Sequence, residues 1–204
     1  MDIGLFGGSF NPPHLAHLVV AEIARDQFGL EEVWWIPNAT PPHKSDRGLA
    51  AVEDRLAMTR RAIDGNPSFR LCDIEVRRSG VSYTVETVRA LQEQHPDTAF
   101  GLLLGSDSLD HFADWHRPDE IADRVPLVVY KRPGVTEEVP EPRFANHVRF
   151  VSAPVMEISG TEIRARRRAG RSIRYLVPVA VRDYIREHGL YQKEPRSKSE
   201  TEEK

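Results

Sequence analysis

The sequence has little of what marks a secreted, membrane-spanning or nucleic-acid-binding chain. Cys72 is the one cysteine among 204 residues, so an internal disulfide is excluded. No stretch approaches the roughly 18 consecutive apolar residues of a membrane span, and Asp2 and a glycine-rich segment stand where a signal peptide would be basic and then apolar. The net charge of -3 gives no overall attraction to nucleic acid or anionic membranes. These absences predict a cytoplasmic protein with neither kind of partner.

What is present is typical of an ordinary globular protein. Hydrophobic residues make up 40% of the chain and charged residues 29%. We expect residues 1–192 to form a single domain, and residues 193–204, which are charged and lack apolar side chains, to form a disordered tail. Cys72 alternates with Ile74 and Val76 in a strand-like run, which predicts a small buried side chain and not a nucleophile.

Apolar runs and helical patterns alternate along the chain. Leu15, Leu18, Val19 and Ile23 share one face of a helix that Gly29 ends. Alternation of strands and helices predicts an α/β fold with a doubly wound parallel sheet and a small C-terminal helical element, whose ligands bind beyond the carboxyl ends of the strands. Strands are expected at residues 3–6 and 33–36, around Phe69, Leu71 and Ile74, and at residues 100–104, 127–130 and 148–151. A long loop is expected at residues 38–48. Further helices are expected at residues 52–63, 84–94, 161–169 and 178–187, and Gly170 and Gly189 are expected to end the last two.

The first candidate site lies between the first strand and the first helix, at residues 7–17. Gly7 and Gly8 let backbone N–H groups approach an anion, and the helix start adds a positive dipole end. His14 and His17 are three residues apart, so both project from one face of the first helical turn and suit a triphosphate. The spacing matches neither a Walker loop nor the dinucleotide fingerprint. The alternative is a tight turn followed by ordinary helix-start histidines.

The second candidate site, residues 158–164, follows the last strand and opens a helix. Ser159 and Thr161 are helix-capping types whose hydroxyls can also face phosphate. Arg164 follows one turn later, and a guanidinium fits phosphate oxygens in forked geometry. The arginines that follow are expected to form a solvated helix face.

Both segments resemble the nucleotidylyltransferase superfamily. Its His-x-Gly-His element is similar to residues 14–17, with Ala16 at the usual glycine, and its Ile-Ser-Ser-Thr-x-x-Arg element is similar to residues 158–164, with Gly160 at the second serine. The resemblance implies a Rossmann-like nucleotidylyltransferase fold, with His17, His14 and Arg164 as catalytic residues. It implies ATP contacts from Gly7, Gly8, Ser9, Phe10, His14, His17, Gly105, Asp107, Ser159, Thr161 and Arg164.

Segments 80–87, 104–117 and 172–178 resemble the bacterial nicotinate mononucleotide adenylyltransferase branch of that superfamily. A pyridine carboxylate needs an aromatic surface and N–H donors. The resemblance implies that Trp115 stacks on the pyridine ring and that the helix start at Tyr83 and Thr84 binds its carboxylate. It further implies acceptor contacts from Asp107, at the ribose, and from the basic residues Lys44 and Arg132.

The implied reaction transfers AMP from ATP to nicotinate mononucleotide, giving nicotinate adenine dinucleotide and pyrophosphate in NAD biosynthesis. Mg²⁺ would accompany ATP, because no carboxylate cage for a resident metal is evident. Other acceptors, such as nicotinamide mononucleotide or phosphopantetheine, stay open, as does formation of a homo-oligomer. A nucleotide-binding module without catalysis is the alternative from another class, and Ala16 and Gly160 are the features that favour it.

Overall fold

The computed structural model describes residues 1–39, 48–78, 80–134 and 139–192. Over these residues the chain forms a six-stranded parallel sheet in the order β3-β2-β1-β4-β5-β6. The strands are β1 (Ile3–Gly8), β2 (Glu32–Pro37), β3 (Phe69–Leu71), β4 (Phe100–Gly105), β5 (Leu127–Tyr130) and β6 (Val148–Val151). This confirms the doubly wound α/β fold expected from the alternating pattern.

The strand order places the candidate site at the centre of the sheet. The chain runs outward from β1 through β2 to β3, then returns to β4 on the other side of β1 and continues to β5 and β6. The direction of winding therefore reverses between β1 and β4, and ligands bind at such a switch point, beyond the carboxyl ends of the strands. The glycine-rich turn follows β1, and Asp107 follows β4.

Helices cover both faces of the sheet. The helices are α1 (Leu15–Phe28), α2 (Val52–Ile63), α3 (Ile74–Arg78), α4 (Thr84–Gln94), α5 (Ser106–Leu109), α6 (Pro118–Arg124), α7 (Gly160–Arg168) and α8 (Val179–Glu187), with short 3-10 turns at η1 (Phe112–Asp114) and η2 (Pro142–His147).

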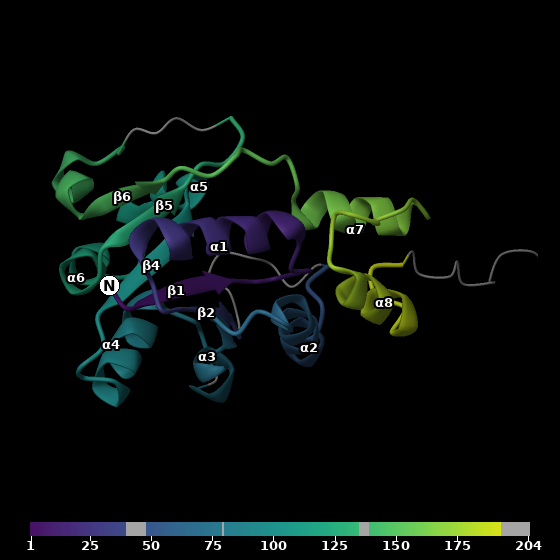
Figure 1. Ribbon diagram of the computed structural model, residues 1–204, viewed down its shortest axis with the longest axis horizontal. Helices are drawn as coiled ribbons and strands as arrows, with labels where there is room; N and C mark the ends of the chain where they lie inside the picture. Colours follow the sequence, from purple (N-terminus) through teal and green to yellow (C-terminus); the bar gives the residue numbers. More distant parts are fainter. Residues whose placement is uncertain (40–47, 79, 135–138, 193–204) are drawn as a thin grey trace, which may run out of the picture.

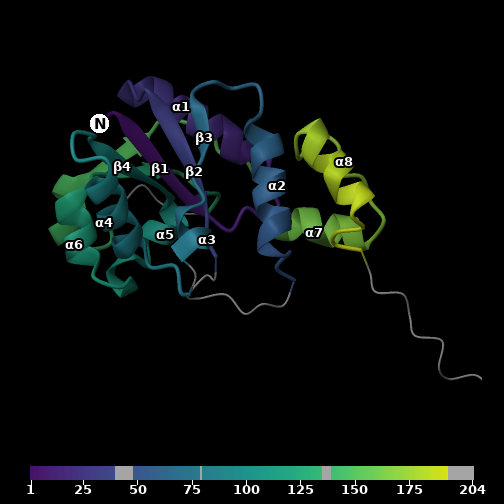
Figure 2. The ribbon, with the colours of Figure 1, turned by 90° about the horizontal axis from the view of Figure 1, so that it is seen from below.

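Alternate residues of the strands belong to two separate cores. Leu5 of β1 packs with the apolar residues of α4 and α6 on one face of the sheet. Phe6, its neighbour, packs with those of α1, α2, α7 and α8 on the other. Figure 2 shows α4 on one side of the strands and α2 on the other, and Figure 1 shows α7 and α8 side by side beyond the end of the sheet. Every residue of β4 is buried, as expected for a strand covered on both faces.

Two details of the helices and strands were not apparent from the sequence. The fully buried residues of α1 are Ala16, Val20, Ala21 and Ala24, whereas the larger residues expected to share one face, Leu15, Leu18, Val19 and Ile23, are half-buried, with Leu18 and Ile23 packed against the core. Small side chains allow the helix to lie close to the sheet, and a pattern of large apolar residues does not reveal them. Cys72 is buried as expected, but β3 ends at Leu71, and Ile74 and Val76 belong to α3.

The ends of the long helices agree with the sequence. Gly29, Gly170 and Gly189 adopt positive φ of 62°, 68° and 62° after α1, α7 and α8, a conformation that glycine reaches without strain. Within the described residues, no helix combines the length and the apolar character needed to cross a membrane. Residues 40–47, including Lys44, and 193–204 lie outside the described residues, so the predictions for them stay predictions.

Candidate active site

Two adjoining cavities open at the carboxyl edge of the sheet. The first has a volume of about 510 Å³ and contains both histidines of the first motif together with Ser159, Thr161 and Arg164 of the second. The second has a volume of about 1010 Å³ and contains Tyr83, Thr84 and Trp115. They share a rim that we call the common edge, made by Phe6, Gly7, Gly8, Ser9, Asp107, Ser108 and Tyr130. Groups bound in the two cavities would therefore meet at the glycine-rich turn.

The glycine-rich turn presents bare backbone to this common edge. A side chain at Gly7 would meet no atom within 4 Å, so the peptide there is open to a ligand. At Gly8 a Cβ atom would lie 3.1 Å from the ring of Phe10, which is buried and has a φ of 44°. Ser9 lines both cavities. The turn has the open backbone that anion binding requires.

His14 and His17 are held together at the start of α1. Their rings are stacked, with centroids 3.6 Å apart and planes inclined by 18°. The backbone N–H of His14, the residue before the helix, donates to Nδ1 of His17 over 3.2 Å. Because Nδ1 accepts this bond, Nε2 of a neutral His17 ring carries the proton. His17 therefore offers an N–H donor from Nε2.

His14 is neutral in this environment. Its side chain is 2% exposed, and burial lowers its pKa to about 3, with a contribution from the positive charge of Arg132. Within the described part of the chain, Nδ1 of His14 is buried and lacks a hydrogen-bond partner. A buried polar atom without a partner costs free energy, so an anion or a bound group that satisfied it would be stabilised.

Arg164 connects the second motif to the first. Its Nη1 donates to the backbone oxygen of Asn11 over 2.8 Å, and its Nη2 donates to the hydroxyl of Thr161 over 3.2 Å. The hydroxyl of Ser159, which precedes α7, accepts from the backbone N–H of Glu162 over 3.2 Å. The two motifs, far apart in the sequence, thus form one wall of the first cavity.

The close packing around position 160 explains why a glycine is found there. A Cβ atom there would lie 2.9 Å from the backbone oxygen of Asn11 and 3.2 Å from Nη1 of Arg164. Any side chain would therefore press on the same hydrogen bond that joins the two motifs. Gly160, the departure from the superfamily pattern, allows the close approach of α7 to the glycine-rich turn.

Asp107 and Arg132 face each other at the common edge. Asp107 lies in the first turn of α5, directly after β4, and its carboxylate is 3.7 Å from Nε of Arg132. Arg132 was assigned to the acceptor, but the structure places it in the first cavity beside the histidines, whereas Gly105, assigned to ATP, lies in the second. The other predicted ATP contacts all line the first cavity.

The second cavity contains the aromatic and helix-terminal groups expected for a pyridine carboxylate. Tyr83 precedes α4 and Thr84 begins it, and both line the cavity, so the N-terminus of α4 lies at its wall. The Trp115 ring packs against Phe112, with centroids 5.3 Å apart, and is half-buried. His116 is exposed and also lines this cavity, with its ring 4.5 Å from that of Tyr83.

Comparison with known proteins agrees with this geometry. The cytidylyltransferase-like family model matches residues 5–166. A protein of Salinibacter ruber named probable nicotinate-nucleotide adenylyltransferase is 75% identical over 192 residues, which cover 94% of this chain and 98% of that protein. A protein of Lactiplantibacillus plantarum with the same name is 45% identical over 192 residues, covering 93% of this chain and 88% of that protein. The chain belongs to the cytidylyltransferase-like family.

The fold is also that of a solved relative. The structure of Plasmodium falciparum nicotinic acid mononucleotide adenylyltransferase complexed with NaAD superposes with a TM-score of 0.80 at 22% identity, covering 93% of this chain and 97% of that chain. The family match and the named relatives confirm the resemblance to nucleotidylyltransferases expected from the two motifs, and this superposition confirms the fold. For this member of the cytidylyltransferase-like family, the described residues include no group of three or more His, Cys, Asp or Glu side chains able to hold a metal ion.

Arg55 holds the glycine-rich turn through a hydrogen bond to Ser9, a role that was not predicted from the sequence. Its side chain is 1% exposed, and burial lowers its pKa from the ordinary value. The guanidinium donates to the backbone oxygens of Ser9, Ala39 and Ala50, at 3.1, 3.0 and 3.2 Å, and to Oδ1 of Asn38 at 3.3 Å. These partners lie in three separate segments, so no spacing in the sequence could have revealed them.

Glu75 is a buried carboxylate in the second cavity and was also missed. It is 8% exposed and accepts hydrogen bonds from the hydroxyls of Thr87, over 2.8 Å, and Ser82. Burial raises its pKa, although these bonds and the nearby Arg78 act in the opposite direction. Ser82 accepts in turn from the backbone N–H of Ala39 over 3.0 Å. Glu75 thus joins the start of α4 to the segment after β2.

Proposed function

We infer that this chain is an adenylyltransferase that joins AMP from ATP to nicotinate mononucleotide, in the cytoplasm and as a step of NAD biosynthesis. The observation that carries this proposal is the pair of cavities with a common edge. One contains the glycine-rich turn and the histidine pair, the other an aromatic side chain and a helix N-terminus. A dinucleotide would extend across both. The names of the 75% and 45% identical relatives support the same reaction.

ATP would place its triphosphate in the first cavity. The backbone at Gly7 and Gly8 and the start of α1 would face the phosphates, and Thr161 and Arg164 would approach from α7. Arg132 lines the same cavity and would add positive charge there. Asp107 at the common edge would accept from ribose hydroxyls.

Nicotinate mononucleotide would occupy the second cavity. Trp115 would stack on the pyridine ring, and the helix start at Tyr83 and Thr84 would bind its carboxylate. A carboxylate gains more from a helix N-terminus than a neutral amide does, which favours the nicotinate form over the nicotinamide form. Lys44 is proposed for the acceptor phosphate on the basis of the resemblance.

The chemistry would be an in-line displacement at the α-phosphorus of ATP. An oxygen of the acceptor phosphate forms the new P–O bond, the bond to the β-phosphate bridging oxygen breaks, and pyrophosphate leaves with that electron pair. The attacking phosphate is already an anion, so no general base is required, and catalysis consists of positioning and charge stabilisation. The Nε2–H of His17 would donate to an α-phosphate oxygen, and neutral His14 would support it.

Mg²⁺ would enter as part of the substrate MgATP. The described residues provide no cluster of ligands, while Asp107 lies at the common edge beside the proposed phosphate cavity. Mg²⁺ commonly takes one or two carboxylates and completes its shell with phosphate oxygens and water, which is compatible with this arrangement. The ion would neutralise phosphate charge.

Release of pyrophosphate from MgATP tests the proposal. Nicotinate mononucleotide, nicotinamide mononucleotide and phosphopantetheine are supplied in parallel as acceptors. Release that depends on the nicotinate form is the expected result. Release with another acceptor alone would overturn the acceptor assignment. ATP binding without pyrophosphate release for any acceptor would favour a nucleotide-binding module without catalysis. The two departures from the superfamily motifs do not favour that alternative, because Gly160 fits its surroundings and the side chain of Ala16 is buried.

A further inference from the structure

Asn11 joins four segments of the chain next to the first cavity. It lies in the glycine-rich motif and is 7% exposed. Its Nδ2 donates to the backbone oxygen of Gly48 over 2.9 Å, and its Oδ1 accepts from the backbone N–H of Ala50 over 3.1 Å. Its backbone oxygen accepts from Arg164, as described above. The remaining contact comes from Tyr191.

Tyr191 follows α8 and reaches back to the first motif. Its hydroxyl donates to Oδ1 of Asn11 over 2.6 Å, a contact between residues 180 positions apart in the sequence. The contact is partly buried, and burial raises the pKa of Tyr191, so its hydroxyl is a protonated donor at physiological pH. Because Tyr191 lines neither cavity, its hydroxyl is not placed to contact substrate.

The position of Asn11 matters to the site through Arg164. The guanidinium of Arg164 is held at one end by the Asn11 backbone oxygen and at the other by Thr161. A shift of the Asn11 peptide would therefore move the guanidinium, and the forked geometry of an arginine on phosphate tolerates little displacement. The side-chain bond from Tyr191 restrains that peptide from the opposite side.

We propose that Tyr191 is a positioning residue for the ATP site, whose hydroxyl fixes Asn11 and thereby fixes the guanidinium of Arg164. This inference rests on the proposed function for its substrates. It adds a role for the segment after α8, which contributes no group to either cavity.

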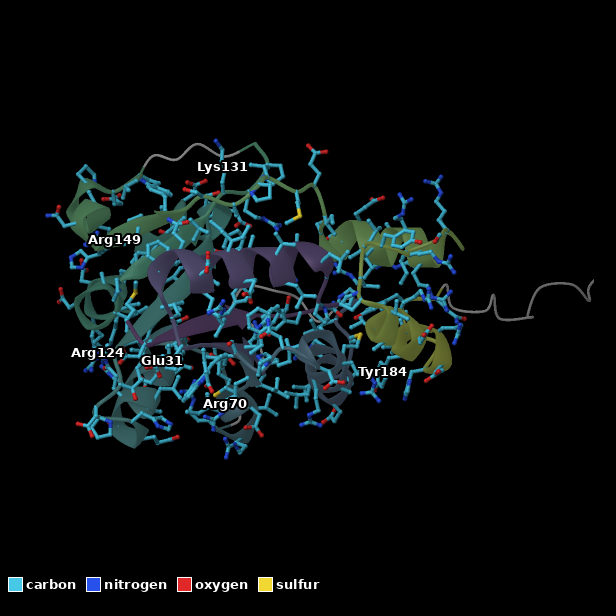
Figure 3. All side chains as sticks on the ribbon, viewed as in Figure 1. Glu31, Arg70, Arg124, Lys131, Arg149 and Tyr184 are labelled. Atoms are coloured by element: carbon cyan, nitrogen blue, oxygen red, sulfur yellow. The ribbon has the colours of Figure 1, made fainter. Side chains whose placement is uncertain are left out.

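Tyr184 provides a matched control. It also donates its hydroxyl to a side-chain oxygen, Oδ1 of Asp54, over 2.8 Å. This contact lies where α8 meets α2, and Figure 3 shows Tyr184 on α8. Neither partner lines a cavity. Tyr184→Phe therefore removes the same chemical group from the same part of the fold without removing a hydrogen bond to Asn11.

The experiment measures KM for MgATP, KM for nicotinate mononucleotide, and kcat in wild type, Tyr191→Phe and Tyr184→Phe. Loss of one hydrogen bond predicts a rise of ~3- to 10-fold in KM for MgATP for Tyr191→Phe, with KM for nicotinate mononucleotide within about 2-fold of wild type. Tyr184→Phe should leave the KM for MgATP and the KM for nicotinate mononucleotide unchanged, although both variants should unfold at a lower temperature than wild type. An equal KM for MgATP in Tyr191→Phe and wild type would overturn the inference.

A double-mutant cycle shows whether the effect passes through Arg164. Tyr191→Phe added to Arg164→Lys should raise KM for MgATP by less than it does in wild type, because the group that it positions has been replaced. Full additivity would mean that Tyr191 acts by another route and would overturn the inference. Inactive wild type would instead count against the proposed function, so the two failures are distinguishable.

Gly160→Ala provides a second approach if Tyr191→Phe does not fold. The added methyl would press on the Asn11 backbone oxygen and on Arg164 without touching Tyr191. The same selective rise in KM for MgATP is expected. If Gly160→Ala leaves that constant unchanged, the contact between Asn11 and Arg164 has no effect on ATP binding, and the positioning role of Tyr191 is refuted.

Discussion

The backbone N–H of His14 is directed at Nδ1 of His17, 3.2 Å away, and this contact determines which nitrogen of His17 carries a proton. The donor at Nε2 is thereby fixed before any substrate binds. Such preorganised donors lower a barrier because they need not reorganise as charge develops. In the proposed reaction, charge develops on the α-phosphate oxygens.

Replacement of His17 should therefore affect turnover more than binding. We expect His17→Ala to lower kcat by ~100- to 1,000-fold, as for loss of one oxyanion donor, with a change of only a few-fold in the Kd for ATP. Single-turnover kinetics and calorimetry measure the two quantities. His188→Ala is the control, because His188 stacks on Tyr184 away from both cavities. Near-normal turnover in His17→Ala would remove His17 from its proposed role.

The burial of His14 predicts a pH dependence of stability. The unfolded chain binds a proton at this residue below about pH 6.5, whereas the folded chain does not do so until about pH 3. The free energy of unfolding should therefore decrease as pH falls through this window, by about 1.4 kcal/mol per unit from this residue alone. Urea unfolding of wild type and His14→Asn between pH 7 and pH 5 measures the difference. Parallel profiles would mean that His14 is protonated in the folded protein.

Trp115 should contribute to binding of the acceptor but not of ATP. Loss of a stacked aromatic ring is worth ~0.5–1.5 kcal/mol, so Trp115→Leu should raise KM for nicotinate mononucleotide by ~3- to 10-fold. Trp115→Phe keeps an aromatic surface and should restore most of the affinity. An unchanged acceptor KM in Trp115→Leu would show that the ring packs only against Phe112.

Glu75 should influence the binding of nicotinate mononucleotide through its hydrogen bonds to the start of α4. Glu75→Leu leaves the hydroxyls of Ser82 and Thr87 without their acceptor, so the start of α4 should loosen and KM for nicotinate mononucleotide should rise by about 10-fold. Glu75→Gln keeps an acceptor oxygen and should stay close to wild type. Glu86→Gln, on the exposed side of the same helical turn, where Glu86 pairs with Arg89 at 2.8 Å, is the control. Equal effects of Leu and Gln at position 75 would assign the role to the charge instead.

Arg55 should be important for stability. Arg55→Met removes the donors to the backbone oxygens of Ser9, Ala39 and Ala50, and leaves buried acceptors without partners, so we expect a loss of ~3 kcal/mol in the free energy of unfolding. Arg60→Met, an exposed position on the same helix, should cost less than ~0.5 kcal/mol. Chemical denaturation compares them, and equal effects would contradict the supporting role of Arg55.

The parts of the fold that could be predicted are those that a local pattern specifies. β4 is a continuous apolar run, and α2 was predicted to span the residues that it occupies. By contrast, α3, α5 and α6 have at most seven residues, too few to show a helical period. The buried face of α1 is made largely of alanine, which propensity alone does not assign to a core.

The same distinction applies to the site. The glycine-rich turn and the histidine pair are contiguous in the sequence, so their common location was predictable. The location of Arg132 in the first cavity was not expected, because the direction of a side chain after β5 depends on tertiary packing; its assignment to the acceptor stays a prediction. Arg55 acts through partners in three separate segments, and Glu75 acts through hydroxyls in and before the next helix. A charged residue in a helix ordinarily indicates a solvated face, so neither role was predictable.

The contact between Asn11 and Tyr191 determines when, during synthesis of the chain, the surroundings of the first cavity can be completed. Ribosomal synthesis delivers the glycine-rich turn first, and 180 further residues must follow before the tyrosine hydroxyl can reach it. A nascent chain would display its histidines long before the arginine and the tyrosine that complete their surroundings. The nucleotide site would therefore be completed only after the segment that follows α8 has been synthesised, and a chain terminated before Tyr191 would lack a fully ordered ATP site.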